Sequence, residues 1–272
     1  MANIARREAR DAQVLLRQDQ GPIAVLTLNR PEARNSLSRE LIGAVTGGIR
    51  EIDGDDAIRA IVVTGAGSAF SSGHDLKELT AHRNDLDRGR EFFAETMGAC
   101  SEMMLGIVRS PKPVIAAVNG VATAAGCQLV ASCDLAVAGA DSRFATPGVN
   151  IGLFCATPMV ALSRNVARKA AMEMLLLGEM VSADEAKTLG LVNLVVEPDR
   201  VVNEAIELGR KIALKPKRTL TIGKEAFYRQ LDMPLEEAYR YASAVMVENM
   251  LDDEAEEGIG AFIDKRTPRW PR

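Results

Sequence analysis

Two glycine-containing turns carry the residue types from which this chain could build a reactive site. The first lies in SSGHDLKEL, residues 71–79, where three small residues form a corner that His74 and Asp75 follow. Backbone N–H groups at such a corner and at the start of the next helix have no partner inside the helix, so they can bind a ligand oxygen. His74 adds an imidazole, whose ordinary pKa is about 6.5. Its role is either direct chemistry or a structural and gating function at the corner.

The second turn lies in VNGVATAAGCQLVASCD, residues 118–134, where a predicted buried strand ends in a run of small residues. A helix is expected to begin near Ala125, so its first N–H groups and its positive dipole end face the turn. Where two such turns meet, two N–H donors can hold one developing oxyanion. Gln128 lies one helical turn after Ala125 on the same face, and helical side chains lean toward the N-terminus. We expect its amide at this site, the alternative being a structural hydrogen-bond partner.

Other chemistries fit these turns poorly. The segment 65–70 follows a predicted strand as a dinucleotide fingerprint would, but Phe70 occupies the third glycine position of GxGxxG. A triad of Ser72, His74 and Asp75 is excluded because neighbouring residues cannot align their side chains in a relay. No spacing of His, Cys and acidic residues matches a metal site, so no metal is expected. The four cysteines form no CxxC pair, which argues against a redox motif or a disulfide framework.

The turns must be positioned by the elements around them, and the apolar spacing predicts an α/β fold. Continuous apolar runs indicate buried strands, and each of the two turns follows one of them. The order of strands and helices indicates crossover connections in a parallel sheet. In chain order we expect a hairpin of strands at 13–18 and 23–30, a helix at 38–53 capped by Ser38, a strand at 59–65, a helix at 88–110 and a strand at 112–118.

The chain after residue 134 is mostly helical. Short strands are expected at DLAVAG, SRFATP and LVNLVV. No linker or repeat separates this part from the rest, so we expect it to pack on the core rather than to form an independent domain. The expected helices are at 157–176, 182–188, 201–213, 217–230, 234–250 and 253–265.

The composition is that of an ordinary globular chain. The 272 residues are 47% hydrophobic and 26% charged, and the formal net charge is −4. The charges of both signs are interspersed, which gives no nucleic-acid surface, and no apolar run approaches the roughly 18 residues of a membrane span. The N-terminal MANIARREARDAQ is too polar for a secretory signal and, unlike a transit peptide, contains acidic residues. We therefore expect a cytoplasmic protein that binds neither nucleic acid nor membrane.

Several segments, taken in chain order, resemble one enzyme superfamily. They are LNRPEARNSLS (28–38), AFSSGHDLKEL (69–79), KPVIAAVNGVATAAGCQLVASCDLAVAG (112–139), FATPGVNIG (144–152), GLVNLVV (190–196) and EGIGAFIDKR (257–266). Together they resemble the crotonase superfamily of enoyl-CoA hydratases and isomerases. The resemblance extends over nearly the whole chain.

The resemblance implies a ββα spiral core with an acyl-CoA site over residues 1–196 and a helical C-terminal trimerisation region over 197–272. It implies a homotrimer or a dimer of trimers, and an acyl-CoA thioester as the partner, with no cofactor other than CoA as part of the substrate. The thioester carbonyl would be held by the N–H groups of His74 and Ala125. The residues that the resemblance assigns to CoA binding are Ala33, Arg34, Asp75, Leu76, Lys77 and, from the last helix, Lys265.

The chain departs from this family at two positions that carry catalytic glutamates in hydratases, which here are Gln128 and Gly148. An amide exchanges no proton near neutral pH and glycine has no side chain, so neither the general acid nor the general base is in its usual place. Efficient water addition is therefore not expected, although enolate stabilisation is retained. Replacing both residues by glutamate should raise hydration if the surrounding geometry is intact.

Three functions remain open from the sequence. The first is an enoyl-CoA hydratase-like enzyme that stabilises a thioester enolate in a site with two N–H donors. The second is a decarboxylase of a malonyl-type acyl-CoA, in which loss of CO₂ generates the enolate without a strong base, although Cys155 stands where that branch has a tyrosine. The third is a non-catalytic CoA-binding or assembly protein, which the missing glutamates favour and the retained AAG and SSGHD segments disfavour.

Overall fold

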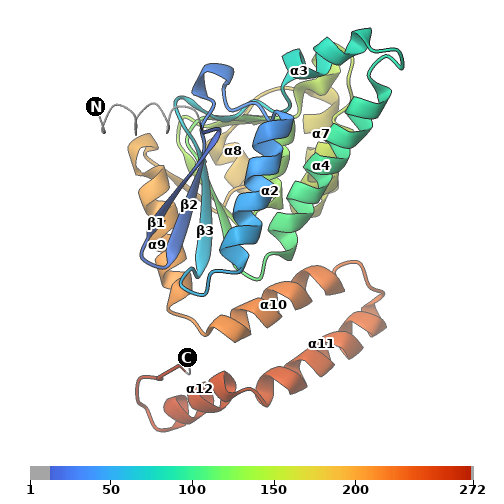
Figure 1. Ribbon diagram of the computed structural model, residues 1–272. Helices are drawn as coiled ribbons and strands as arrows, with labels where there is room; N and C mark the ends of the chain where they lie inside the picture. The colour runs from blue at the N-terminus through green and yellow to red at the C-terminus, as the bar shows by residue number, and fades with distance from the viewer. Residues whose placement is uncertain (1–12, 271–272) are drawn as a thin grey trace, which may run out of the picture.

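Two sheets form the centre of the protein, whose computed structural model is drawn in Figure 1. The structure describes residues 13–270. The larger sheet contains, in spatial order, β1 (Leu15–Gln20), β2 (Ile23–Leu28), β3 (Ala60–Gly65), β5 (Val114–Val118), β7 (Leu135–Gly139) and β10 (Leu194–Val196). The smaller sheet contains β4 (Ala69–Ser71), β6 (Val121–Thr123), β8 (Arg143–Ala145) and β9 (Val181–Ser182).

The chain spirals between these sheets. Three times it leaves a strand of the larger sheet and enters a strand of the smaller one, from β3 to β4, from β5 to β6 and from β7 to β8. The three strands in each of these sets pair in parallel. The two turns singled out in the sequence therefore follow neighbouring parallel strands, β4 and β6, and lie at the same edge of the smaller sheet.

Helices cover both faces of the larger sheet, and the helices that follow residue 216 extend beyond it. The helices are α2 (Arg39–Asp53), α3 (Leu76–Ala81), α4 (Arg90–Arg109), α5 (Ala125–Ser132), α6 (Ala156–Asn165), α7 (Arg168–Leu177), α8 (Ala183–Thr188), α9 (Val201–Ala213), α10 (Lys217–Gln230), α11 (Leu235–Met250) and α12 (Asp253–Ile263). None of the helices within residues 13–270 is both long and apolar enough to cross a membrane.

Most of the local predictions are confirmed. β1 and β2 form the expected antiparallel hairpin, with Gly21 at φ +62° in its turn. The Ser38 side chain accepts a hydrogen bond from the Leu41 N–H at 3.3 Å, as an N-cap does. All residues of β3 and β5 are buried, which explains their continuous apolar runs.

One helix prediction was wrong. The single helix expected at 157–176 is two helices, α6 and α7, separated by two residues. Val166 has extended backbone angles at this break and its side chain is 3% exposed. Burial of Val166 against the core therefore favours the break, although no glycine or proline marks it in the sequence.

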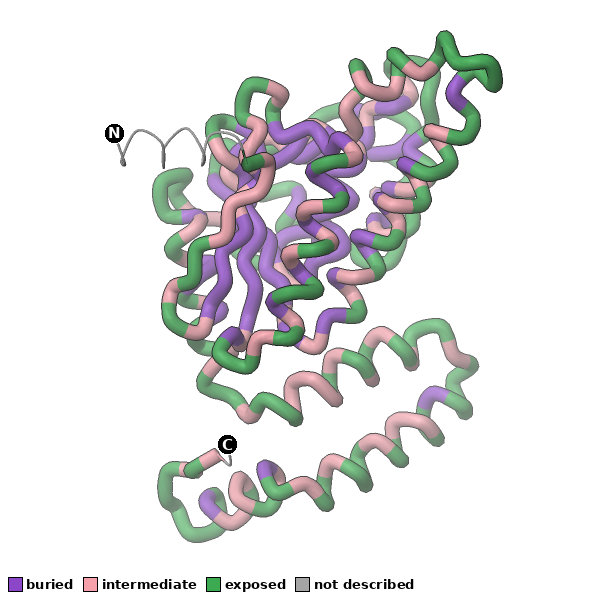
Figure 2. Tube along the Cα trace, viewed as in Figure 1, coloured by how far each residue is buried: buried purple, intermediate pink, exposed green. Residues whose placement is uncertain are grey.

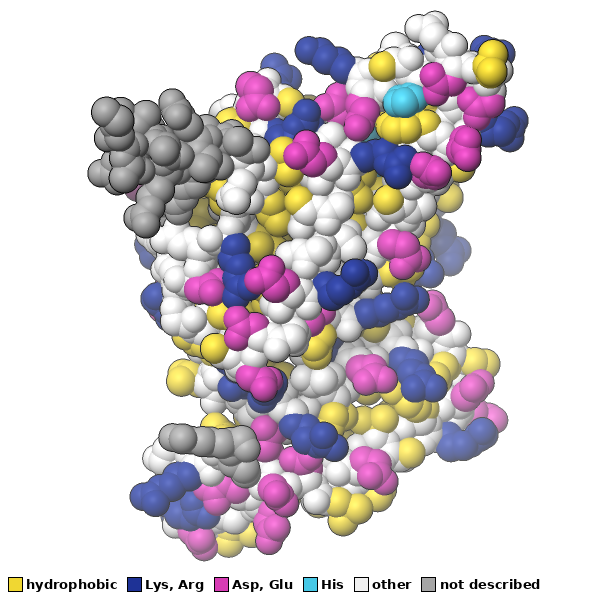
Figure 3. Space-filling model, viewed as in Figure 1, with side chains coloured by type: hydrophobic (Ala, Val, Ile, Leu, Met, Phe, Trp, Pro, Cys, Tyr) yellow, Lys and Arg dark blue, Asp and Glu magenta, His cyan; other side chains and the backbone are white. Residues whose placement is uncertain are grey.

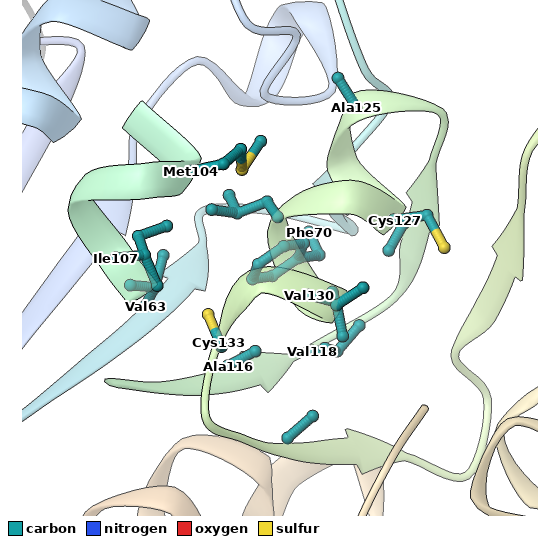
Figure 4. Packing of buried hydrophobic residues seen from close by; sticks show 14 of the residues in the cluster. Val63, Phe70, Met104, Ile107, Ala116, Val118, Ala125, Cys127, Val130 and Cys133 are labelled. Atoms are coloured by element: carbon teal, nitrogen blue, oxygen red, sulfur yellow. The ribbon is translucent and has the colours of Figure 1, made fainter. Parts of the chain in front are cut away.

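The main core lies between α2, α4, α5 and the sheets, and Figure 2 shows the buried strands at its centre. Figure 4 shows Phe70 beneath α5, surrounded by Val63, Ile107 and Val118. A second cluster lies on the opposite face of the larger sheet, where α9 packs on β3, β5 and β7. This packing fixes the β strands that lead into both turns.

The C-terminal helices are attached more loosely. The expected boundary at 196/197 falls before α9, but α9 packs on the sheet and the chain leaves the core only at α10. A buried ion pair of 2.7 Å between Lys224 of α10 and Asp134 holds this helix to the core, and Tyr228 donates a hydrogen bond of 2.8 Å to the same carboxylate. Beyond it, α11 and α12 extend away from the sheets (Figure 1).

Candidate active site

The first turn leaves one backbone donor without a partner. After β4 the chain passes through Gly73 at φ +90° to His74, and α3 follows. Leu37 accepts a hydrogen bond from the Asp75 N–H at 3.2 Å and donates one of 2.7 Å to the Gly73 carbonyl. These bonds hold the peptide groups on both sides, while the His74 N–H between them has no acceptor within residues 13–270.

The second turn has the same property. After β6, Ala124 takes the unusual angles φ 50° and ψ −117°, and α5 begins at Ala125. No side chain caps this helix, and the Ala125 N–H has no acceptor in the described part of the chain. An uncapped helix start keeps its free N–H groups and its partial positive charge for a ligand. Ala125 lies at the start of α5 and belongs to the same buried cluster as Phe70 (Figure 4).

The two turns are in direct contact. A Cβ atom built on Gly73 would lie 2.8 Å from the Ala124 Cβ and 3.2 Å from the Ala125 nitrogen. A Cβ atom on Gly126 would lie 2.2 Å from the Ser71 carbonyl oxygen. Only glycine fits at both positions, and because of this close approach the unpaired N–H groups of His74 and Ala125 lie on neighbouring backbone corners.

The His74 side chain is also without a partner. Both of its ring nitrogens are buried, and neither has a hydrogen-bond partner within residues 13–270. Burial lowers the pKa of His74 below its ordinary value, since the charged imidazolium loses its hydration. The imidazole is therefore neutral at neutral pH and presents one donor and one acceptor nitrogen.

The two positions at which hydratases of the family carry glutamates, here Gln128 and Gly148, differ in the space available for a side chain. Gln128 is 5% exposed and its Oε1 has no partner in the described residues. Gly148 lies in a 3₁₀ turn, Pro147–Ile151, where a Cβ atom would lie 2.4 Å from the Leu153 carbonyl oxygen and 2.9 Å from the Cys155 Sγ. The backbone of residues 148–155 therefore fills the space that a second carboxylate would need.

The thiols near these positions are poor nucleophiles. Burial raises the pKa of Cys127 to about 12, with a further contribution from the neighbouring Cys155. Burial also raises the pKa of Cys155. Both groups are protonated at neutral pH, so neither replaces the missing carboxylates.

The residues expected to bind CoA are placed in two parts of the molecule. Ala33, Arg34, Leu76 and Lys77 lie close in the chain to the first turn, and all except Ala33 are exposed. The Asp75 carboxylate N-caps α3 and forms an ion pair of 2.9 Å with Arg30. Lys265 follows α12, which lies at the opposite end of the molecule from α3 (Figure 1), so one chain does not bring it to the turns.

Two further residues frame the first turn, and sequence reasoning missed them. Arg30 donates to the Ser36 carbonyl at 2.7 Å and pairs with Asp75. Asn35 is fully buried and at φ 52°, and its amide bonds to backbone groups of two other segments. An asparagine inside a proline-containing turn motif was the available signal, because asparagine tolerates the left-handed region and bonds to nearby backbone.

Some surface cavities of the described residues include neither of the two turns. One of about 320 Å³ lies between α7, β9 and α8 and includes Glu173, Glu179 and Glu185 in its lining. It contains none of the residues of the two turns, and no group of three or more His, Cys, Asp or Glu side chains within residues 13–270 could hold a metal ion.

Comparison with known proteins identifies the fold and the family. Residues 18–272 match the enoyl-CoA hydratase/isomerase family. The chain is 46% identical over 254 residues to enoyl-CoA hydratase domain-containing protein 3, mitochondrial, of Rattus norvegicus, covering 93% of this chain and 83% of the relative. The sequence motifs resemble this same group, and that likeness is confirmed.

Solved structures agree with the sequence comparison. The crystal structure of human enoyl coenzyme A hydratase domain-containing protein 3 superposes with a TM-score of 0.90 at 44% identity and covers 95% of this chain and 100% of that one. An enoyl-CoA hydratase of Mycobacterium smegmatis gives a TM-score of 0.89 at 49% identity, with 95% and 99% covered. The α/β spiral is therefore the crotonase fold, as the resemblance implied.

One expectation is overturned by these relatives, and the family assignment stands. The cytoplasmic location expected from the polar N-terminus is wrong, because relatives from rat, frog, mouse, human and zebrafish are all named mitochondrial. Residues 1–12, on which much of that expectation depended, lie outside the described residues. From its family match, its relatives and its fold, the chain belongs to the enoyl-CoA hydratase/isomerase family.

Proposed function

We propose that the protein binds an acyl-CoA thioester and stabilises its enolate with the N–H groups of His74 and Ala125. One observation carries this proposal: the two backbone turns are in contact, and the N–H groups of His74 and Ala125 on these turns have no acceptor within the described residues. Each correctly placed donor of this kind contributes about 100- to 1,000-fold in rate for reactions that pass through an oxyanion. The alternative, a solvated pair of turns, does not explain why glycine is required at both contacts.

Hydration requires groups that the two backbone turns do not supply. Water addition needs a group that activates water and a group that handles the α-proton, and each such group contributes about 100- to 10,000-fold. The amide of Gln128 does neither, and no side chain fits at 148. We infer that the protein retains the thioester chemistry of the family without efficient hydratase activity.

Decarboxylation of a malonyl-type acyl-CoA is the second candidate, and the unpartnered ring nitrogens of His74 favour it. In this reaction the bond between the α-carbon and the carboxylate breaks, its electron pair forms the thioester enolate, and a proton from solvent converts the enolate to the product. No base is needed, and a neutral imidazole can donate a hydrogen bond to the carboxylate. A non-catalytic CoA-binding role is the third candidate.

We also propose a homotrimer or a dimer of trimers. α11 has one buried residue among its described side chains, and α10 has none. Exposed apolar side chains on this region include Phe227, Leu235, Tyr239, Met250, Leu251 and Phe262, and Figure 3 shows hydrophobic side chains along the lower helices. Contact between copies would cover them, and it would allow Lys265 of one copy to approach an acyl-CoA held at the turns of another.

A three-part assay on the purified protein tests the proposal. Crotonyl-CoA reports hydration, methylmalonyl-CoA reports CO₂ release, and butyryl-CoA in deuterated water reports exchange of the α-protons. We expect hydration near background together with measurable binding of all three esters. Hydration at an ordinary enzyme rate would contradict the inference from Gln128 and Gly148, and absence of CoA-ester binding would overturn the proposed function.

A further inference from the structure

The short loop 65–69 between β3 and β4 is held from two sides by asparagine side chains. The Asn35 Nδ2 donates to the carbonyls of Ala66 at 2.9 Å and of Ala69 at 2.7 Å. The Asn119 Nδ2 donates to the carbonyls of Gly65 at 2.7 Å and of Gly67 at 3.1 Å. Four carbonyls of one loop are thus bound by two amides, which leaves no free donor on either Nδ2.

Asn35 connects this loop to the first turn. It is fully buried, its Oδ1 accepts the Arg30 N–H at 2.9 Å, and its own carbonyl accepts the Ser71 hydroxyl at 2.9 Å. Two residues later, Leu37 forms the two backbone bonds on either side of His74. A displacement of Asn35 is therefore transmitted through rigid backbone to the His74 N–H.

Asn119 connects the same loop to the second turn. It follows β5 directly and precedes β6, the strand that leads to Ala124 and the start of α5. Its Oδ1 accepts the Gly65 N–H at 3.2 Å. The next residue, Gly120, touches the loop, since a Cβ atom there would lie 2.3 Å from the Ser68 carbonyl oxygen. The second turn is thus fixed to loop 65–69 by side-chain and backbone contacts together.

We propose that Asn35 and Asn119 are positioning residues that set the distance and orientation between the N–H groups of His74 and Ala125 by binding one shared loop. This proposal rests on the proposed function, because it assigns the two donors to one thioester oxygen. Asparagine suits both places because its amide offers two donors and one acceptor on a short stem. Aspartate has the same shape but no donor, so it leaves the loop carbonyls unpaired.

The test measures the infrared carbonyl band of butyryl-CoA, labelled with ¹³C at the thioester carbon, when bound at saturation to each variant. Asn35→Gly removes the amide without backbone strain at φ 52°, and Asn35→Asp keeps its shape and acceptor. Asn119→Ala removes the second amide. The matched control is Asn165→Ala, because Asn165 also donates to two carbonyls, those of Ala131 and Ala161, but it is the last residue of α6 and lies beside the C-terminal end of α5, away from loop 65–69.

In the wild-type protein and in Asn165→Ala, we expect the band to shift to lower wavenumber on binding, as two hydrogen bonds require. In the Asn35 and Asn119 variants we expect loss of most of this shift, with Kd raised by less than about tenfold because the remaining CoA contacts are intact. The double variant should lose little more than either single variant, since both amides act on one loop. Melting curves confirm that each variant is folded.

The outcomes separate the two proposals. If the wild-type protein binds the ester without a shift of the band, the proposed function fails and the positioning role fails with it. If the wild-type band shifts and the folded asparagine variants keep the full shift, the positioning role alone is overturned. A loss of shift in Asn165→Ala equal to that in the other variants would also overturn it, because the effect would not be specific to loop 65–69.

Discussion

In the proposed site, the two backbone turns and the two acid–base positions are built in opposite ways. In the turns, glycine is required at Gly73 and Gly126, and the N–H groups of His74 and Ala125 have no acceptor within the described residues. At the acid–base positions, one residue has lost its charge and the other has lost its side chain to a loop that fills the space. This difference supports the proposal that thioester binding and proton transfer depend on different segments of the chain.

The largest loss of stability is expected from Gly126→Ala. The added Cβ would lie 2.2 Å from the Ser71 carbonyl oxygen, so β4 and α5 must move apart, and the free energy of unfolding should fall by about 3 kcal/mol or more. The measurement is urea unfolding, together with acyl-CoA binding of the folded fraction. The control is Gly98→Ala in α4, which meets nothing within 4 Å and should raise stability by about 0.5–1 kcal/mol. Equal changes of stability in Gly126→Ala and Gly98→Ala would contradict the requirement for glycine at position 126.

The second-largest effect is expected on stability when the two acid–base positions, 128 and 148, are changed. Replacing Gln128 and Gly148 together by glutamate was expected to raise hydration if the geometry is intact, but the Leu153 carbonyl lies where the new Cβ at 148 must go. We therefore expect the double variant to lose about 1–3 kcal/mol of stability and to gain no hydration of crotonyl-CoA. Gln128→Glu alone should fold with a smaller loss. A large gain in hydration by the double variant would show that loop 148–155 opens easily.

The smallest effect is a pH dependence at the first turn. Burial lowers the pKa of His74 in the folded state, so the unfolded chain binds a proton more readily, and stability falls as the pH drops from 7 through the unfolded-state pKa of about 6.5 toward the lower folded-state pKa. The slope from this one group cannot exceed about 1.4 kcal/mol per pH unit. His74→Leu should remove this part of the dependence, measured by urea unfolding between pH 7 and 5.

The control for this measurement is His82→Leu. His82 is the C-cap of α3 and is partly exposed; it pairs with Asp85 at 2.8 Å and stacks on Phe92. The pH dependence due to His74 should persist in this variant. A wild-type stability that stays flat over this range would contradict the burial of a neutral imidazole at the turn.

Much of the fold could be predicted from the sequence because the signals are local. α9 and α10 begin and end where the apolar spacing places them, at 201–213 and 217–230, and the strands β3 and β5 follow from their apolar runs. The break between α6 and α7 could not be predicted, because the burial of Val166 depends on packing against distant segments.

The candidate site, like the fold, was only partly predictable from the sequence. The small residues around Gly73 and Ala125 indicated free N–H groups, but their contact depends on an approach of backbones about 50 residues apart in the chain, which periodicity does not encode. The loss of the glutamate at 148 was visible in the sequence, whereas the filling of its space by the Leu153 carbonyl was not. The asparagine bonds to loop 65–69 are likewise tertiary contacts of residues whose local role is only a turn.

The most direct test of the central claim is a paired measurement on the wild-type protein with one unreactive and one reactive ester. The carbonyl band of bound butyryl-CoA reports the two N–H donors, and the rate of crotonyl-CoA hydration reports the acid and the base. We predict that the carbonyl band of bound butyryl-CoA shifts to lower wavenumber and that crotonyl-CoA hydration stays near background. An unshifted band, or hydration at an ordinary enzyme rate, would contradict the central claim.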